Sequence, residues 1–306
     1  MRDEERSLER TSWLLISAML AVFLVLQIQT QFALAPLGLA AVSIALSLLC
    51  LGWGRAMTLD QPRAAAGAVA LIQMTLFTLL AVAISFAIAA RGGALWDASL
   101  AAADRALGFD WPSLRRILDQ SPSLVMVLGV SYHSLALQMV VAICGLSAAG
   151  KLDQLRMLVF TAVVSGFTTV LLSGLFPARG NLFDPAEYRH LWPSVPWQQM
   201  ELLHGLRHGG VRMIDFLRLE GIVTFPSYHA TLSVIFASSF RHVPGMRLAG
   251  PSLAGLTFIA TPVFGGHYMV DVLAGAILAL ISLAVARMLA TRTPKFVLAP
   301  VSACRA

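Results

Sequence analysis

Charge is scarce in this chain of 306 residues. Only 12% of the residues are Asp, Glu, Lys or Arg, whereas 58% are hydrophobic and the mean hydropathy is +0.76. This balance excludes an ordinary soluble globular domain and indicates an integral membrane protein. Lysine is nearly absent, so the net charge of +6 depends on arginine. Because the arginines lie mostly at the ends of apolar runs or in two long loops, anionic lipid headgroups are the expected partner, and nucleic acid is not.

Cysteine is also scarce. Cys50 and Cys144 fall within apolar runs and Cys304 lies near the C-terminus, so the sequence offers no disulfide framework. A cleaved signal peptide is not indicated either. The segment before Trp13 carries both acids and arginines, and the apolar stretch that follows is far longer than a signal core. We expect this segment to remain as a membrane anchor.

Long runs without any charged residue dominate the rest of the chain, and each is long enough to cross a bilayer. The first run, 11–54, is punctuated by glutamines and Pro36, which favours a hairpin of two helices. The sequence therefore predicts an all-α, polytopic transmembrane bundle of about eight spans. The expected spans are 13–30, 35–53, 65–90, 122–148, 156–176, 226–242, 248–264 and 268–290.

Two long hydrophilic segments interrupt this pattern. Residues 91–121 mix Trp, Leu and Phe with Asp and Arg, which suits short amphipathic helices lying in the membrane interface. Residues 177–225 are richer in Pro, Trp and Arg, and they form either a lid or vestibule over a site or a merely solvated connector.

Three regions are expected from this organisation. Residues 1–121 form an N-terminal transmembrane region with an interfacial loop, 122–291 form a catalytic transmembrane core, and 292–306 form a cytoplasmic tail. With the N-terminus inside, 13 of the 22 Lys and Arg residues fall in cytoplasmic segments. The positive-inside rule then predicts that both long loops face the extracytoplasmic side.

Two short polar motifs stand at the mouths of apolar runs: Phe225-Pro226-Ser227-Tyr228-His229-Ala230 and Gly266-His267-Tyr268-Met269-Val270-Asp271. Ionisable groups beside a membrane are costly, so two histidines and a carboxylate at matched depth indicate a reaction site.

The four-residue spacing of His267 and Asp271 predicts that they lie one above the other on a helix face. The carboxylate would fix the imidazole tautomer and leave the second ring nitrogen free to act as a nucleophile. His229 would protonate a leaving alkoxide and later deprotonate an incoming hydroxyl. Ser227 would donate its hydroxyl to phosphate at an open helix N-terminus.

These residues resemble the type-2 phosphatidic acid phosphatase superfamily, mainly over residues 170–290. Phe-Pro-Ser-Tyr-His and Gly-Gly-His-Tyr-Met-Val-Asp are most similar to the branch that contains inositol phosphorylceramide synthases and their bacterial relatives. The resemblance implies a phosphohistidine at His267, a general acid and base at His229, and an orienting carboxylate at Asp271. It also implies a metal-independent reaction, so no cofactor is expected.

The chain also departs from the superfamily pattern. The first motif, Lys and then Arg-Pro after six intervening residues, is missing, and Ala260 and Thr261 stand where the third motif has Ser-Arg. Other cations must therefore meet the phosphate charge, and guanidinium suits bidentate contact. We favour Arg207 and then Arg179. The candidates upstream of His229 are Arg179, Arg189, Arg207, Arg212 and Arg218.

Three alternative interpretations stay open. His229, His267 and Asp271, or His204 with His208, could ligate zinc. The polar run from Tyr132 to Gln138 could line the substrate cavity or form hydrogen bonds between spans. Intramembrane histidines could also relay protons in a transporter, although such proteins often show repeat symmetry between their halves, and none is evident in this sequence.

The resemblance favours a membrane lipid phosphotransferase, with a lipid or polyprenyl phosphate phosphatase as the alternative. The expected donor is a phospholipid, sphingolipid or polyprenyl phosphoester, and the acceptor is an alcohol or water. The expected location is a bacterial inner membrane, with the site on its extracytoplasmic side.

Overall fold

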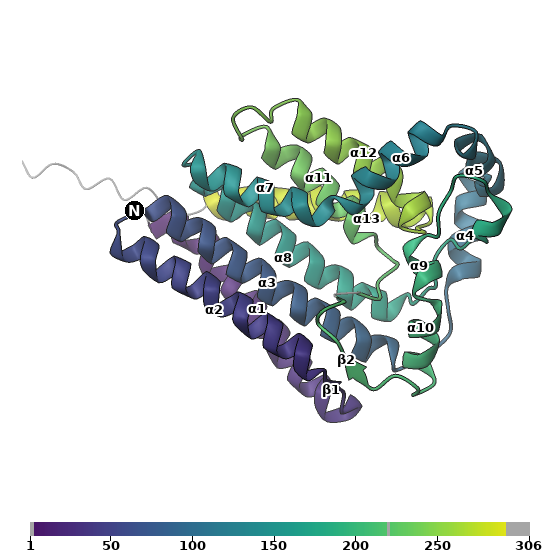
Figure 1. Ribbon diagram of the computed structural model, residues 1–306, viewed down its shortest axis with the longest axis horizontal. Helices are drawn as coiled ribbons and strands as arrows, with labels where there is room; N and C mark the ends of the chain where they lie inside the picture. Colours follow the sequence, from purple (N-terminus) through teal and green to yellow (C-terminus); the bar gives the residue numbers. More distant parts are fainter. Residues whose placement is uncertain (1–2, 219–220, 292–306) are drawn as a thin grey trace, which may run out of the picture.

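The computed structural model describes residues 3–218 and 221–291, and it is almost entirely helical. The predicted tail, 292–306, lies outside the described residues. Figure 1 shows long helices running roughly side by side, with the shorter helices α4, α5, α9 and α10 gathered at one end. The α-helices are α1 (Asp3–Thr30), α2 (Pro36–Thr58), α3 (Pro62–Ala89), α4 (Asp97–Ala106), α5 (Trp111–Asp119), α6 (Pro122–His133), α7 (Leu135–Ala148), α8 (Leu152–Leu175), α9 (Val195–Gln198), α10 (Met200–Arg207), α11 (Tyr228–Phe240), α12 (Ala249–Phe264) and α13 (Met269–Thr291).

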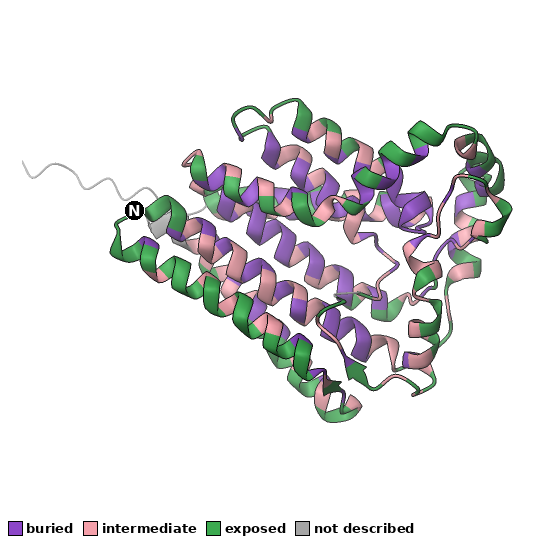
Figure 2. Ribbon diagram, viewed as in Figure 1, coloured by how far each residue is buried: buried purple, intermediate pink, exposed green. Residues whose placement is uncertain are grey.

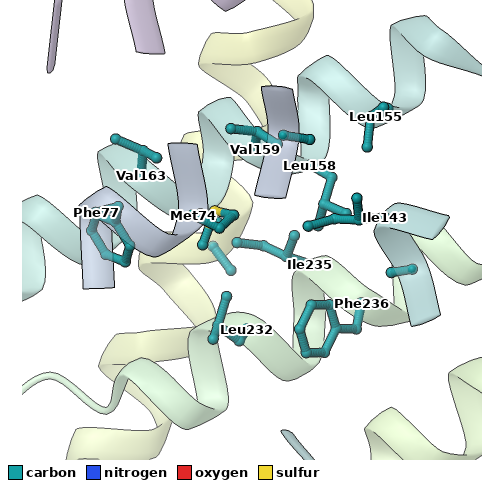
Figure 3. Close-up of a cluster of buried hydrophobic side chains, with 14 of the residues drawn as sticks. Met74, Phe77, Ile143, Leu155, Leu158, Val159, Val163, Leu232, Ile235 and Phe236 are labelled. Atoms are coloured by element: carbon teal, nitrogen blue, oxygen red, sulfur yellow. The ribbon is translucent and has the colours of Figure 1, made fainter. Parts of the chain in front are cut away.

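Helix α8 forms the centre of the bundle and contacts α1, α3, α7, α11 and α13. Its apolar side chains pack with those of α3, α7 and α11, as Figure 3 shows for Met74, Ile143, Leu158 and Ile235. In contrast, α2 packs mainly on α3, and Figure 2 shows it as largely exposed. Exposed leucine and isoleucine side chains along a hydrophobic helix are expected where lipid replaces water as the solvent.

Five of the described helices are long and apolar enough to cross a membrane, namely α1 from Ser7, α2, α3, α8 and α13, with the last counted to Ala290. The pair α6 and α7 gives a sixth span if it is counted as one, although the two helices are bent by 57° at Ser134. The predicted count of about eight spans is therefore not confirmed. Helix α11 has 13 residues and α12 has 16. At 1.5 Å per residue they extend only roughly 20 to 24 Å, against roughly 30 Å for a hydrocarbon core.

The two long loops carry short structural elements. The first loop contains α4 and α5, and the expectation that its helices lie in the membrane interface stays a prediction. The second contains a 3₁₀ turn (Pro185–Glu187), α9, α10 and strand β2 (Met213–Ile214). Strand β2 pairs in parallel with β1 (Ala33–Leu34), in the turn between α1 and α2. The second loop is thus tied to the N-terminal helices and is not a free connector.

A carboxylate clasp joins the two loops. Asp119, at the end of α5, accepts hydrogen bonds from the backbone N–H groups of Arg189, His190 and Leu191 at 2.7 to 2.9 Å. Burial alone would raise the pKa of Asp119, but the three N–H donors together hold that pKa below its ordinary value.

Candidate active site

The two sequence motifs meet where α11 and α13 begin. The backbone N–H of Ser227 donates to the carbonyl of Asp271 at 3.0 Å. One turn further on, the Thr231 hydroxyl donates to the carbonyl of Gly275 at 2.9 Å. A Cβ atom at Gly275 would lie 2.3 Å from the carbonyl oxygen of Ser227, so only glycine permits this approach. Close helix packing therefore fixes the relative positions of the motifs.

His267 and Asp271 form the predicted pair, but the geometry differs from the expected helical stack. Helix α13 begins at Met269, so His267 lies in the turn that precedes it. Gly266 in that turn has φ of +57°, which ends α12 and reverses the chain. Asp271, the third residue of α13, accepts from the backbone N–H of Tyr268 at 2.9 Å, as the acidic residue of a capping box does. The same carboxylate also faces the imidazole ring of His267.

The imidazole and the carboxylate lie close together and are buried. His267 Nδ1 is 3.5 Å from Asp271 Oδ2, and the two side chains are only 5% and 0% exposed. Within the described residues, His267 Nδ1 has no hydrogen-bond partner, and neither does Asp271 Oδ1. Such distances are often long in an empty site and shorten when substrate binds. Since Nδ1 faces the carboxylate, Nε2 is the ring nitrogen available for attack.

His229 is the second residue of α11 and shares its surroundings with His267. Both histidines line a small cavity of about 470 Å³, its open mouth included. The ring of Tyr132 stacks on His229 with centroids 4.5 Å apart and an interplanar angle of 14°. This stacking fixes the plane of the imidazole.

Ser227 is fully buried and serves as the N-cap of α11, because its hydroxyl oxygen accepts from the backbone N–H of Ala230 at 3.3 Å. The hydroxyl hydrogen remains free to donate. Ser227 does not line the small cavity, unlike His229 two residues later.

Arg179 lines the small cavity with both histidines, whereas Arg207 does not. The Arg179 side chain is 57% exposed, and its Nε lies 3.9 Å from Asp97 Oδ2. Arg207, at the end of α10, donates to the carbonyl of Gly93 instead. The favoured arginine of the sequence analysis is therefore held away from the histidines, and the second choice is brought to them.

The second long loop forms one wall of the small cavity and does not merely connect helices. The residues that this loop contributes come from the segment after α8, from α9 and α10, and from the segment before α11, while Tyr132 and Gly265 complete the wall. This placement agrees with a vestibule over the histidines. The lining residues from this loop are Ala178, Arg179, Val195, Pro196, Gln199, Leu203, Gly221, Ile222, Val223 and Thr224.

Two aspartates of α4 hold the turn that carries His267, and the sequence analysis did not assign them a role. Asp97 accepts from the backbone N–H groups of Arg179 and Gly180 and from the Tyr268 hydroxyl at 3.0 to 3.2 Å. Asp104, which is 1% exposed, accepts from the backbone N–H groups of Met269 and Val270 at 2.8 and 3.0 Å.

The spacing of these aspartates gave a usable signal. Asp97 and Asp104 are seven residues apart, which places both on one face of an amphipathic helix. Asp104 also accepts from Trp111 Nε1 at 2.6 Å. The sequence does not show that the partner of this face is the start of α13.

The polar run of α6 and α7 divides between the two expected roles. Tyr132 lines the small cavity beside His229. Gln138 instead donates to Ser134 Oγ at 2.9 Å and to Thr257 Oγ1 of α12 at 2.8 Å. Gln138 therefore ties α7 to α12, as interhelical polar side chains do in membrane proteins.

The proposed metal ligands do not form a cluster. Within residues 3–218 and 221–291, no group of three or more His, Cys, Asp or Glu side chains is arranged to hold a metal ion. The rings of His204 and His208 stack at 4.1 Å, and His208 Nδ1 lies 2.9 Å from the His204 carbonyl.

The fold and site together define a helical membrane protein in which two histidines and an arginine line one cavity and a buried carboxylate lies behind one of the histidines. A family model described as the PAP2 superfamily matches residues 98–285, more than half of the chain, and the protein belongs to this superfamily. Membership indicates a phosphatase or phosphotransferase of lipid phosphoesters. Neither the curated proteins nor the solved structures include a match to this chain.

Proposed function

We propose that this protein is a membrane lipid phosphotransferase of the inositol phosphorylceramide synthase-like kind, working through a phosphohistidine on His267. The observation that carries the proposal is that His267, His229 and Arg179 line one cavity while Asp271 backs the first histidine. These are a nucleophile, an acid and base, a cation and an orienting group, and all four roles are needed for phosphoryl transfer by covalent catalysis.

In the first half-reaction, His267 Nε2 attacks phosphorus and the bond from phosphorus to the leaving oxygen breaks. His229, in its protonated form, gives its proton to that oxygen. Asp271, on the Nδ1 side, stabilises the positive charge that develops on the His267 ring. Arg179 balances the charge on the non-bridging phosphate oxygens.

In the second half-reaction, an acceptor hydroxyl gives its proton to His229 and attacks the phosphohistidine. The bond between Nε2 and phosphorus breaks, and the histidine returns to its neutral form. An alcohol acceptor gives transfer and water gives hydrolysis, so the same residues serve both outcomes. We favour transfer because the site is surrounded by apolar helices that restrict water, and because the motifs resemble the synthase branch.

The proposal includes the setting of the site. We propose a bacterial inner membrane, with the histidines toward the extracytoplasmic side and α11 and α12 completing about eight membrane-embedded segments. The excess of Lys and Arg in the expected cytoplasmic segments supports this orientation.

The test is turnover of a fluorescent lipid phosphoester by the detergent-purified protein in the presence of a chelator. Wild-type protein should form product, and the His267→Ala variant should not, while both elute as the same monodisperse species. Adding inositol, glycerol or ceramide should divert product from free phosphate to a new phosphoester. Release of phosphate alone, insensitive to every acceptor, would favour the phosphatase alternative.

A further inference from the structure

A second, larger cavity extends from the histidines into the membrane-spanning part of the bundle. Its volume is about 2090 Å³, its open side included, and its walls come from α2, α3, α7, α8, α11 and the described part of the second long loop. The walls are almost entirely apolar. His229 and His267 line this cavity as well as the small one, so the two hollows meet at the imidazoles.

We propose that this larger cavity, the chain groove, binds the hydrocarbon chain of the lipid phosphoester, and that α2 and α3 determine which chain lengths are accepted. The inference rests on the proposed function of the histidines. It adds a binding site in which α2 and α3, which precede the family match that begins at residue 98, supply part of the wall.

The two hollows suit the two ends of one amphipathic molecule. The small cavity is lined by Arg179 and polar backbone, which suits a phosphate and its headgroup. Among the residues that the structure describes, the chain groove is lined mainly by aliphatic and aromatic side chains, and no Asp, Glu, Lys or Arg lines it. When the phosphorus atom lies at His267, the hydrocarbon chain attached to it is therefore expected to enter the chain groove.

The dimensions of the chain groove fit one leaflet. Along α3 its lining runs from Val82 to Leu71. At 1.5 Å per residue this is roughly 16 Å, about half of the hydrocarbon thickness of a bilayer. A chain that starts at the histidines thus reaches the region of the bilayer midplane at Leu71.

The wall formed by α2 is built from small side chains. Ala41, Val42 and Ala45 line the chain groove, and Ala45 is exposed. Because lipid tails are as apolar as the groove, hydrophobic transfer adds little here, and fit depends on shape and van der Waals contact. Filling the space left by Ala45 should therefore exclude long chains and spare short ones.

The experiment compares two versions of the fluorescent lipid phosphoester, with hexanoyl and with palmitoyl chains, as substrates for four proteins. These are wild type, Ala45→Trp in α2, Ala136→Trp in the facing wall of α7, and the control Ile44→Trp. Ile44 is 61% exposed, neighbours Ala45 and does not line the groove. Using two walls keeps the test valid if one variant fails to fold.

We expect each groove variant to lower the palmitoyl-to-hexanoyl ratio of kcat/KM by about tenfold or more. The control should retain the wild-type ratio. An unchanged ratio in the groove variants would overturn the inference. If the ratio is unchanged but the oligomeric state differs from that of wild type, the chain groove is occupied by a second copy of the protein and not by a lipid chain. His267→Ala, run alongside, separates failure of the chain groove from failure of the proposed chemistry.

Discussion

The backbone N–H of Ser227 donates to the carbonyl of Asp271 at 3.0 Å, so the two motifs that carry the histidines are hydrogen-bonded to each other. The bond joins the cap of α11 to the first turn of α13. As a consequence, His229, two residues after Ser227, and His267, four residues before Asp271, line the same cavities. Backbone contacts between the two helices therefore fix the positions of the proposed acid, His229, and the proposed nucleophile, His267.

Replacing Arg179 should affect catalysis far more than replacing Arg207. Arg179 lines the cavity of the histidines, whereas Arg207 is bound to the carbonyl of Gly93. We expect Arg179→Ala to lower kcat/KM by roughly 100-fold, as loss of a charge-stabilising donor does. Arg207→Ala, the matched control, should change it little. A larger loss of kcat/KM in Arg207→Ala than in Arg179→Ala would indicate that Arg207 binds the phosphate.

Asp104→Asn should impair the reaction without removing any group that touches substrate. The Asp104 carboxylate accepts from the N–H groups of Met269 and Val270 and from Trp111 Nε1. An amide nitrogen facing these donors cannot accept, which costs about 1 to 3 kcal/mol of stability. The start of α13 should shift, so kcat should fall while KM changes little.

The control for that substitution is Asp110→Asn in the same segment. Asp110 is exposed, and its carboxylate accepts only from the nearby Ser113 hydroxyl among the bonds of the described residues. The unfolding temperature and the steady-state kinetic constants of this variant should be close to those of wild type. Equal losses in both variants would show that Asp104 has no specific positioning role.

The Asp119 clasp should make the second long loop sensitive to acid. The pKa of Asp119 lies below its ordinary value of 3.8, because the backbone N–H groups of Arg189, His190 and Leu191 favour the ionised form. Stabilisation by a carboxylate of depressed pKa is complete above the ordinary value and is lost as the pH falls through the lower folded value. The protection of these three amides against hydrogen exchange, relative to the intrinsic rate at each pH, should therefore fall only below about pH 4.

Asp119→Asn supplies the control for that measurement. At neutral pH the variant should exchange these amides faster than wild type, and the difference should disappear in acid. A variant that matches wild type at neutral pH would show that the clasp does not hold the loop.

Much of the helical pattern could be predicted from composition. Long apolar runs form helices close to the expected ranges because a chain in lipid must satisfy its backbone internally. The break at Ser134 could not be predicted, since no Pro or Gly marks it and the bonds of Gln138 to α12 depend on tertiary packing. The short lengths of α11 and α12 could not be predicted either, because counting apolar residues does not show where a helix begins and ends.

The site was predicted unevenly for similar reasons. His229, His267 and Asp271 stand out because buried ionisable groups are rare in apolar sequence. Arg179 and Arg207 are equivalent in sequence, and only the path of the second long loop separates them. Asp104 is one acid among several in an amphipathic segment, and its partners are backbone groups that no sequence pattern reveals.

The most direct test of the central claim is chemical identification of the covalent intermediate. Wild-type protein is mixed with a lipid phosphoester labelled at phosphorus, quenched in alkali and analysed by mass spectrometry of its peptides. The proposal predicts an acid-labile phosphoryl group on His267, absent from His267→Ala and formed more slowly in His229→Asn. A label on any other residue, or full turnover by His267→Ala, would contradict it.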